Sequence, residues 1–441
     1  MAPFKWCVCV VMIGAVSNVA MSQQDVAPVA NRAAPAPQPS ADQTVAPGAM
    51  TLAELEEMAL SRNPALSQAS HYMEAAKGRQ LQVGLYPNPT VGYLGSEIGN
   101  EGRAGQQGSY VGQEIVTAGK LRLRRDVVAQ EVRQAEFTWQ SQRQRLLTDV
   151  RRSFYDVLVA QRKMELTEQL LRISEEGMHS TESLVQAKEA ARADVLQAKI
   201  EAESTRVLLE RSRNQYASAW RGLAAATGSP NMPPRPLMGE ASDNLPHLTW
   251  EETCERLLTD SPQIAAAQAG VARAQAAVRR EYAQRIPNID TQMSVQYDNA
   301  TRNTFATVQA GVPLPLFNRN QGNIRRTEAE LLAAQENVER AKLDLQRRLA
   351  TVFERYTTAR YQVEKYSRDI LPSAKTSLDL ANQGYREGEY NYLFLLTAQR
   401  TFFQANLVYL DALRELRSAA TAIEGNLLSD SLQEQEAAAA D

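Results

Sequence analysis

The chain has 441 residues, with 48 basic and 51 acidic side chains and a formal net charge of −3. This near balance excludes a strong electrostatic attraction for nucleic acid, so no nucleic-acid partner is expected. The length allows roughly two to four ordinary domains.

The first 22 residues have the pattern of a secretory signal. Lys5 precedes an apolar run over residues 6–16, and the small residues at 20–22 offer a cleavage site. The apolar run is too short to cross a bilayer as a helix. Residues 1–22 are therefore predicted to be a signal peptide. After its removal Cys254 is the one remaining cysteine, so no internal disulfide is expected.

Two segments have too few apolar residues to compensate for the entropy of ordering. Residues 23–49 are rich in proline, alanine and glutamine, and they are predicted to form a disordered tether. Residues 426–441 are predicted to form a flexible tail for the same reason.

The sequence between these segments predicts a tandem duplication. The first repeat spans residues 51–229, a linker spans 230–247, and the second repeat spans 248–425. A capping-box start, an X-Pro helix start and a Pro-Asn bend each occur twice, in the same order. The paired positions are Thr51 and Thr249 (249 − 51 = 198), Pro64 and Pro262 (262 − 64 = 198), and Pro87 and Pro287 (287 − 87 = 200). Ordered agreement of this kind indicates an internal repeat.

Each Pro-Asn bend is followed by a predicted β-hairpin, over residues 90–116 and 289–314. Apolar and polar residues alternate in 289–297, which is typical of a strand with two different environments. Each strand has about nine residues, the length that a tilted strand needs to cross a bilayer. Two interpretations are open: hairpins that lie on a soluble core, or hairpins that several chains pool into one closed membrane barrel.

In the barrel interpretation, one face of the second hairpin meets lipid. The predicted lipid-facing residues are Ile289, Met293, Val295 and Tyr297. The predicted aromatic residues of the barrel surface are Tyr93, Tyr110, Tyr297 and Phe305, each of which has ordinary packing as its alternative.

The remaining patterns are long helices, and none offers ~20 uninterrupted apolar residues. The predicted helices span residues 121–177, 193–227, 324–371 and 392–425. The first would be a rod of about 85 Å, far beyond the average helix of ~11 residues. Pro372 is predicted to kink the third. Their charged faces suit a solvated coiled-coil hairpin or the wall of a water-filled tube.

No enzymatic or metal-binding pattern is found. His71, His179 and His247 are far apart and lack metal-ligand spacing. Nucleophile-elbow, P-loop and dinucleotide fingerprints do not occur in the sequence. We therefore expect no catalytic, cofactor or metal site.

Over residues 51–425 the sequence resembles outer-membrane efflux proteins of the TolC type. The most specific part is Ile370-Leu371-Pro372-Ser373-Ala374, followed by residues 384–390 and 393–399. Gly112-Gln113-Glu114-Ile115, Gly119-Lys120 and the Pro-Asn bends also fit the family.

This resemblance implies a mainly α fold with a membrane β-barrel. Three protomers would each contribute four strands to a twelve-stranded barrel, and tandem helical hairpins would form a periplasmic α-barrel below it. The implied function is a passive exit duct in the outer membrane of a Gram-negative cell. The implied partners are a periplasmic adaptor and an inner-membrane pump of the RND type, and the pattern resembles the heavy-metal branch. The alternative is a secreted or periplasmic coiled-coil scaffold without a barrel.

In the family, aspartates on the return helix of the second repeat close the tunnel. Two positions of that motif correspond here to Phe394 and Thr397, so this sequence departs from it. The first repeat has Asp194 and Gln197 at the equivalent positions, each 200 residues earlier. The predicted constriction is lined by Asp194, Gln197, Phe394 and Thr397. Alternatively, Asp194 only caps its helix.

The turns between the long helices are predicted to dock the adaptor. The docking residues are Lys188 and Arg192 in the first repeat and Arg386, Gly388, Glu389 and Tyr390 in the second. The alternative is a pair of solvent-exposed turns without a partner.

Overall fold

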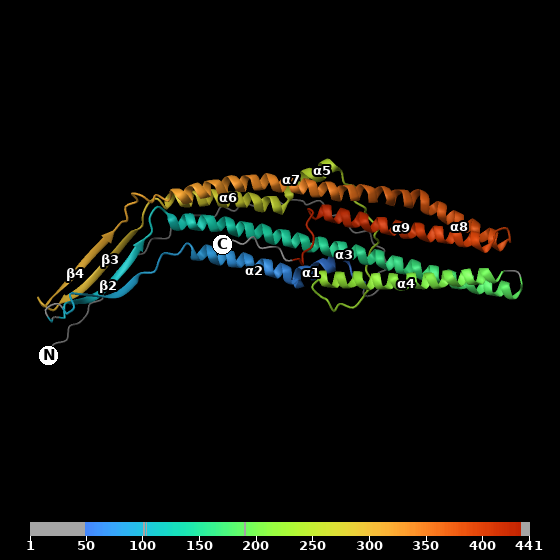
Figure 1. The fold of residues 1–441 in the computed structure, drawn as a ribbon, viewed down its shortest axis with the longest axis horizontal. Helices are drawn as coiled ribbons and strands as arrows, with labels where there is room; N and C mark the ends of the chain where they lie inside the picture. Colours follow the sequence, from blue (N-terminus) through green and yellow to red (C-terminus); the bar gives the residue numbers. More distant parts are fainter. Residues whose placement is uncertain (1–48, 100–101, 103, 189–190, 434–441) are drawn as a thin grey trace, which may run out of the picture. The chain divides into compact units, whose positions relative to one another are not determined.

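The computed structural model describes residues 49–99, 102, 104–188 and 191–433. The predicted signal peptide, residues 23–48 of the predicted tether, and residues 434–441 of the predicted tail lie outside these residues. In the described part, the strands gather at one end and the helices run away from them (Figure 1).

The two predicted hairpins form one antiparallel sheet. Its strands are β1 (Thr90–Ser96), β2 (Gln106–Ile115), β3 (Ile289–Asp298) and β4 (Asn303–Gly311). The strand order is β1-β2-β3-β4, so β2 and β3 join the hairpins of the two repeats. Strands β1 and β4 are therefore the two edges of the sheet.

Apolar side chains form a row across all four strands. The register pairs Val91 with Val111, Val111 with Met293, and Met293 with Val308. Their exposed fractions are 75%, 51%, 55% and 75%, respectively. Because residues directly opposite each other on neighbouring strands point to the same side, these four residues share one face of the sheet.

The opposite face is mainly polar. Ser294 and Gln296 lie on it, and only 4% and 6% of their surfaces are exposed. Tyr110 pairs with Ser294, and Phe305 pairs with Gln296. The prediction that Tyr110 and Phe305 share the surface of Met293 is therefore wrong, because cross-strand partners lie on the same face.

The helices form two similar series, one in each repeat. The first series is α1 (Leu52–Arg62), α2 (Pro64–Gln82), α3 (Lys120–Gln186) and α4 (Arg192–Ala226). The second series is α5 (Trp250–Asp260), α6 (Pro262–Ala283), α7 (Gln321–Lys365), the π-helical turn η2 (Tyr366–Ile370), α8 (Leu371–Arg386) and α9 (Tyr392–Glu424). The predicted capping box at Thr51 and Glu54 is confirmed, since both of its hydrogen bonds are present.

Helix α3 continues past the predicted end at Gly177, to Gln186. A Cβ at Gly177 would lie 3.3 Å from Tyr392 Oη. We infer that the glycine allows close packing of α9 and does not mark a helix end. The helix ends where Lys188 adopts a φ of 64°.

The helical path of the second repeat also continues past its predicted end at Leu371, to Arg386. The π-helical turn η2 lies directly before the Leu371-Pro372 start of α8. Proline lacks the N–H that an α-helix requires in its interior. The wider turn accommodates this loss without ending the helix.

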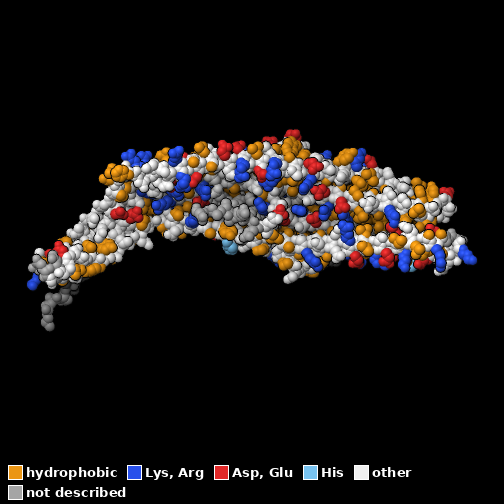
Figure 2. All heavy atoms as spheres, viewed as in Figure 1, with side chains coloured by type: hydrophobic (Ala, Val, Ile, Leu, Met, Phe, Trp, Pro, Cys, Tyr) orange, Lys and Arg blue, Asp and Glu red, His pale blue; other side chains and the backbone are white. Residues whose placement is uncertain are grey.

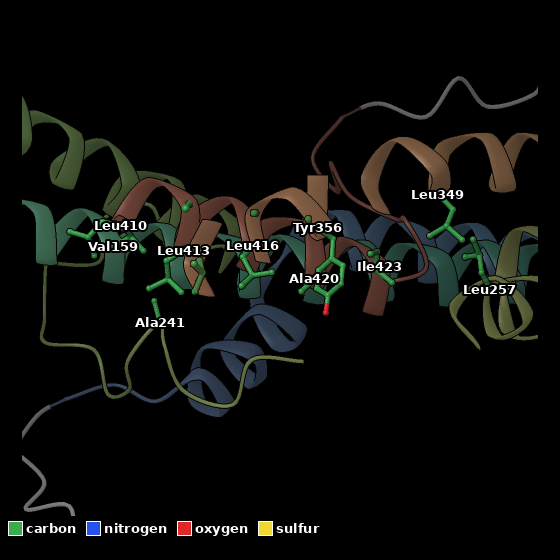
Figure 3. Packing of buried hydrophobic residues seen from close by; sticks show 14 of the residues in the cluster. Val159, Ala241, Leu257, Leu349, Tyr356, Leu410, Leu413, Leu416, Ala420 and Ile423 are labelled. Atoms are coloured by element: carbon green, nitrogen blue, oxygen red, sulfur yellow. The ribbon is translucent and has the colours of Figure 1, made fainter. Parts of the chain in front are cut away.

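Near the sheet, α2 packs on α3, α3 on α6, and α6 on α7. Farther away, α3 packs on α4 and α8 packs on α9. Figure 3 shows part of the core, in which Ala420 and Ile423 of α9 lie near Tyr356 of α7. A second cluster joins α1, α3 and α4 around Leu55, Val150 and Trp220. Across residues 49–99, 102, 104–188 and 191–433, no helix is both long enough and apolar enough to cross a bilayer.

The first part of the predicted flexible tail is packed against α3. Leu428 and Ser431 are 1% and 2% exposed. The carboxylate of Asp149 accepts hydrogen bonds from the backbone N–H groups of Asp430 and Ser431, at 3.0 and 2.6 Å. The prediction of flexibility is therefore wrong for residues 426–433, because these contacts compensate for the cost of ordering them.

Candidate functional site

The predicted constriction and docking residues lie at the ends of the long helices that are farthest from the sheet (Figure 1). One turn joins α3 to α4, and the other joins α8 to α9, so the polypeptide reverses direction twice at this end. Figure 2 shows acidic and basic side chains interspersed over the helical part of the visible face.

The turn between α8 and α9 is closed by backbone hydrogen bonds. Gly388 has a φ of 78°, a conformation that glycine adopts without a Cβ clash. The N–H of Glu389 donates to the carbonyl of Gly384 at 2.8 Å and caps the end of α8. A Cβ at Gly384 would lie 2.3 Å from the ring of Tyr390. The tip thus requires two glycines, one for its turn and one to seat Tyr390.

The turn between α3 and α4 uses Lys188 where the second repeat has Gly388 (388 − 188 = 200). Lys188 adopts a φ of 64°, in the left-handed region that costs an ordinary residue about 1 kcal/mol. Arg192 is the first residue of α4, and Arg386 is the last residue of α8. The docking role of these residues stays a prediction.

Asp194 lies in the first turn of α4. Its Oδ2 accepts a hydrogen bond from the N–H of Ala191 at 3.1 Å, which satisfies a donor at the start of the helix. The capping role is therefore present in the structure. Gln197 lies one turn farther along α4, and both side chains are partly buried.

Phe394 occupies the first turn of α9, where Asn391 is the N-cap. The N–H of Phe394 donates to Asn391 Oδ1 at 2.9 Å. The Phe394 ring is 50% exposed, and its centroid lies 4.5 Å from that of Tyr390. Thr397 is exposed and donates to the carbonyl of Leu393 at 2.8 Å. In the second repeat, Phe394 therefore forms an aromatic pair with Tyr390, and the Thr397 hydroxyl is hydrogen-bonded to the backbone of its own helix.

Within one chain, the structure brings Phe394 together with Tyr390. Among the described residues, no hydrogen bond, ion pair or ring contact joins Asp194 or Gln197 to Phe394 or Thr397. Each pair instead occupies the start of its own return helix. A shared constriction therefore requires contributions from more than one helical hairpin.

Sequence reasoning missed an ion pair that joins the two return helices. Arg400 of α9 donates to Glu201 of α4 through Nε, at 3.0 Å, and also through Nη2. Only 11% of the Glu201 side chain is exposed. The hydrogen bond to Glu201 raises the pKa of Arg400, so the arginine stays charged. The sequence did contain a signal for this pair: Glu201 and Arg400 carry opposite charges and lie about two turns beyond the predicted constriction on their helices.

The comparisons agree with this arrangement. The family description "Outer membrane efflux protein" matches residues 55–229 and 253–427, two segments that begin 198 residues apart (253 − 55). The cobalt-zinc-cadmium resistance protein CzcC of Cupriavidus metallidurans is 27% identical over 382 residues, which is 86% of this chain and 90% of that protein.

Two solved structures have the same fold. The structure of CusC aligns with a TM-score of 0.72 and 19% identity, over 86% of this chain and 92% of that one. The outer-membrane channel OprN aligns with a TM-score of 0.71 and 21% identity, over 87% and 91%. The family matches cover most of the chain, and they favour the channel over the soluble scaffold. The chain therefore belongs to the outer membrane efflux protein family, and it is a non-enzymatic efflux channel of the outer membrane with a periplasmic helical tunnel.

Proposed function

We propose that three copies of this chain pool their four-stranded sheets into one twelve-stranded barrel, which opens into a tunnel of long helices. Substrates delivered by an inner-membrane pump through a periplasmic adaptor then leave the cell through this duct. The observation that carries the proposal is the open sheet, whose exposed apolar row of Val91, Val111, Met293 and Val308 ends at two unpaired edges.

An open sheet is unstable in a bilayer. Lipid offers no hydrogen bonds, so the unpaired N–H and C=O groups of β1 and β4 must find partners in other strands. The two edges belong to different strands, so the contact between copies joins unlike surfaces, and a ring forms when the rotation from copy to copy closes. The family resemblance supports three copies, which would give twelve strands, an even number that such barrels favour.

A contact inside one chain suggests how neighbouring copies meet. The exit from β2 into α3 is held at the bend of the second repeat, where Thr117 Oγ1 donates to the carbonyl of Pro287 at 2.6 Å. Lys120 Nζ donates to Asn288 Oδ1 at 2.6 Å in the same place. The duplication implies an equivalent contact between the exit from β4 into α7 and the bend at Pro87.

Both of these equivalent surfaces are apolar and exposed. In the exit from β4, Leu314, Leu316 and Phe317 are 75%, 65% and 91% exposed. Next to the bend at Pro87, Tyr86 is 72% exposed. Large exposed apolar patches mark interaction surfaces. The exit from β4 of one copy is therefore expected to cover the bend of the next.

Cysteine pairs test this assembly. In a Cys254→Ser background, Asn88→Cys with Phe317→Cys is expected to give covalent dimers and trimers on oxidation in isolated outer membranes. The control pair, Thr117→Cys with Asn288→Cys, joins side chains that lie close together within one chain, with Thr117 Oγ1 3.5 Å from Asn288 Oδ1. It should therefore close without an increase in mass on non-reducing gels. Monomers alone from the first pair, with a closed control, would contradict the proposed assembly.

The cargo follows from a different observation. The relative with 27% identity over 90% of its length is a cobalt-zinc-cadmium resistance protein. We infer that the cargo of this duct is a divalent metal cation. The predicted constriction supports this inference because copies of Asp194, one for each protomer, would form a ring that attracts cations.

Asp194→Ala is expected to weaken the preference of the channel for cations. The change removes the carboxylate from the predicted constriction and also a helix cap worth about 1 kcal/mol. Single-channel recordings measure the preference, and the tolerance of cells to cobalt, zinc and cadmium measures export. Asp194→Asn is the matched control, since it keeps a capping oxygen without the charge. Unchanged selectivity in both variants would leave Asp194 with the capping role alone.

A further inference from the structure

A groove of about 1080 Å³ runs between α3, α6 and α7. Its α6 wall is built from small residues such as Ala266, Gly270 and Ala274. Because the side chains of α6 are small, they leave space between the longer side chains that α3 and α7 contribute to the groove. The volume of this groove is sufficient for a segment of extended peptide.

Positive charge dominates the groove. Six arginines line it, with three acidic residues among the same lining side chains. The arginines are Arg145, Arg273, Arg280, Arg326, Arg340 and Arg348. Two of the acidic residues pair with lining arginines, Glu330 with Arg326 and Asp344 with Arg348. The third, Glu131, pairs with Arg79 of α2.

Three of the arginines lack a carboxylate partner. Among the residues that the structure describes, Arg145, Arg273 and Arg340 make no ion pair within 4 Å. Arg340 donates to the neutral amide of Asn337, at 2.7 Å. Burial, and then the nearby charge of Arg348, lower the pKa of Arg145. The groove would therefore gain stability from additional negative charge.

The polypeptide approaches this groove near its C-terminal end. Gln142 Nε2 donates to the carbonyl of Ser431 at 2.6 Å, and Arg145 Nη1 lies 3.4 Å from the carbonyl of Ser429. Arg145 itself lines the groove, as does Ser141 beside Gln142. The last described residue is Gln433. The described residues therefore end close to Arg145, one of the arginines of the groove.

The segment that follows Gln433 has the complementary charge. Residues 434–441 contain Glu434, Glu436 and Asp441, four alanines and no basic residue. Eight residues reach up to about 26 Å when extended. The groove runs along α3 from Arg145 to Glu131, 14 residues or about 21 Å of helix. We propose that residues 434–441 dock in this groove, with their carboxylates against Arg273 and Arg340.

Directed disulfide formation in the full-length protein tests the docking. In the Cys254→Ser background, Ala437→Cys with Ala274→Cys is expected to cross-link at least fivefold faster than Ala437→Cys with Leu332→Cys. Leu332 lies on the same helix as Arg340 but outside the groove, and it is 64% exposed. Equal rates for the two pairs would overturn the proposal, because they would show a tail that samples the surface without preference.

Charge changes test the proposed cause. Glu434→Gln, Glu436→Gln and Asp441→Asn together should slow the Ala274 cross-link severalfold, and so should Arg273→Gln with Arg340→Gln. High salt should have the same effect, since the attraction is electrostatic. These tail changes lie outside the packed helices, so they should leave folding intact. A rate that is unaffected by both sets of changes would reject electrostatic docking and favour a different occupant of the groove.

Discussion

Met293→Arg is expected to abolish assembly of the channel in the outer membrane. Met293 lies in the middle of the exposed apolar row, paired with Val111 on one side and Val308 on the other. An arginine on a lipid-facing strand costs about 2–4 kcal/mol near the bilayer midplane. Because the proposed barrel contains three copies of the chain, the cost would apply three times in each barrel. The amount of trimer in outer-membrane fractions, measured on gels without boiling, is the readout.

Gln292→Arg is the matched control for this change. Gln292 is adjacent in sequence, but its partners are Gly112 and Gln309, on the face that also carries Ser294. An arginine there would face the water-filled lumen of the proposed barrel, so assembly should be close to normal. If Gln292→Arg were the more damaging change, the assignment of the two faces would be reversed.

Arg417→Met should destabilise the helical part by about 3 kcal/mol. Arg417 is only 6% exposed, and its guanidinium binds the linker between the repeats. Its Nε donates to the carbonyl of Ala241 at 2.7 Å, and its Nη2 donates to the carbonyl of Asp243. The guanidinium also lies 4.6 Å from the ring centroid of Tyr155. Methionine fills similar volume but leaves the buried carbonyl of Ala241 without this donor and removes the contacts to the Asp243 carbonyl and the Tyr155 ring, which accounts for the cost.

Urea unfolding of the purified protein in detergent measures the loss of stability in Arg417→Met. Arg414→Met is the matched control, one turn earlier on α9. The Arg414 side chain is 54% exposed, and its Nε lies 3.9 Å from Asp156. A surface pair of this kind contributes at most about 1 kcal/mol. Equal losses for Arg417→Met and Arg414→Met would show that the linker contacts do not carry the stability assigned to them.

The element types, and many of their starts, were predictable because their signals are local. The Thr51 capping box and the proline starts at Pro64 and Pro262 act within one turn of helix, and the structure has each of them. The alternation in residues 289–297 predicted β3, which begins at Ile289 and ends one residue later than expected. For the candidate site, the repeat offset located Asp194 and Phe394 at the starts of α4 and α9.

The predictions that failed, and the ion pair that sequence reasoning missed, depended on contacts between distant segments. Gly177 resembles a helix end in the sequence, but in the structure it makes room for Tyr392. The face of Tyr110 depended on its pairing with Ser294, 184 residues away (294 − 110). The pairing of Glu201 with Arg400 depended on how α4 and α9 pack.

The sequence by itself determined the duplication, the strands and the long helices, because periodicity and capping are properties of neighbouring residues. Only the tertiary structure decided which side chains meet across the sheet and between the helices. It ordered residues 426–433 against Asp149, buried Arg417 under the linker, and placed arginines from α3, α6 and α7 around one groove. These arrangements depend on packing free energy between segments far apart in the chain, and no local pattern encodes it.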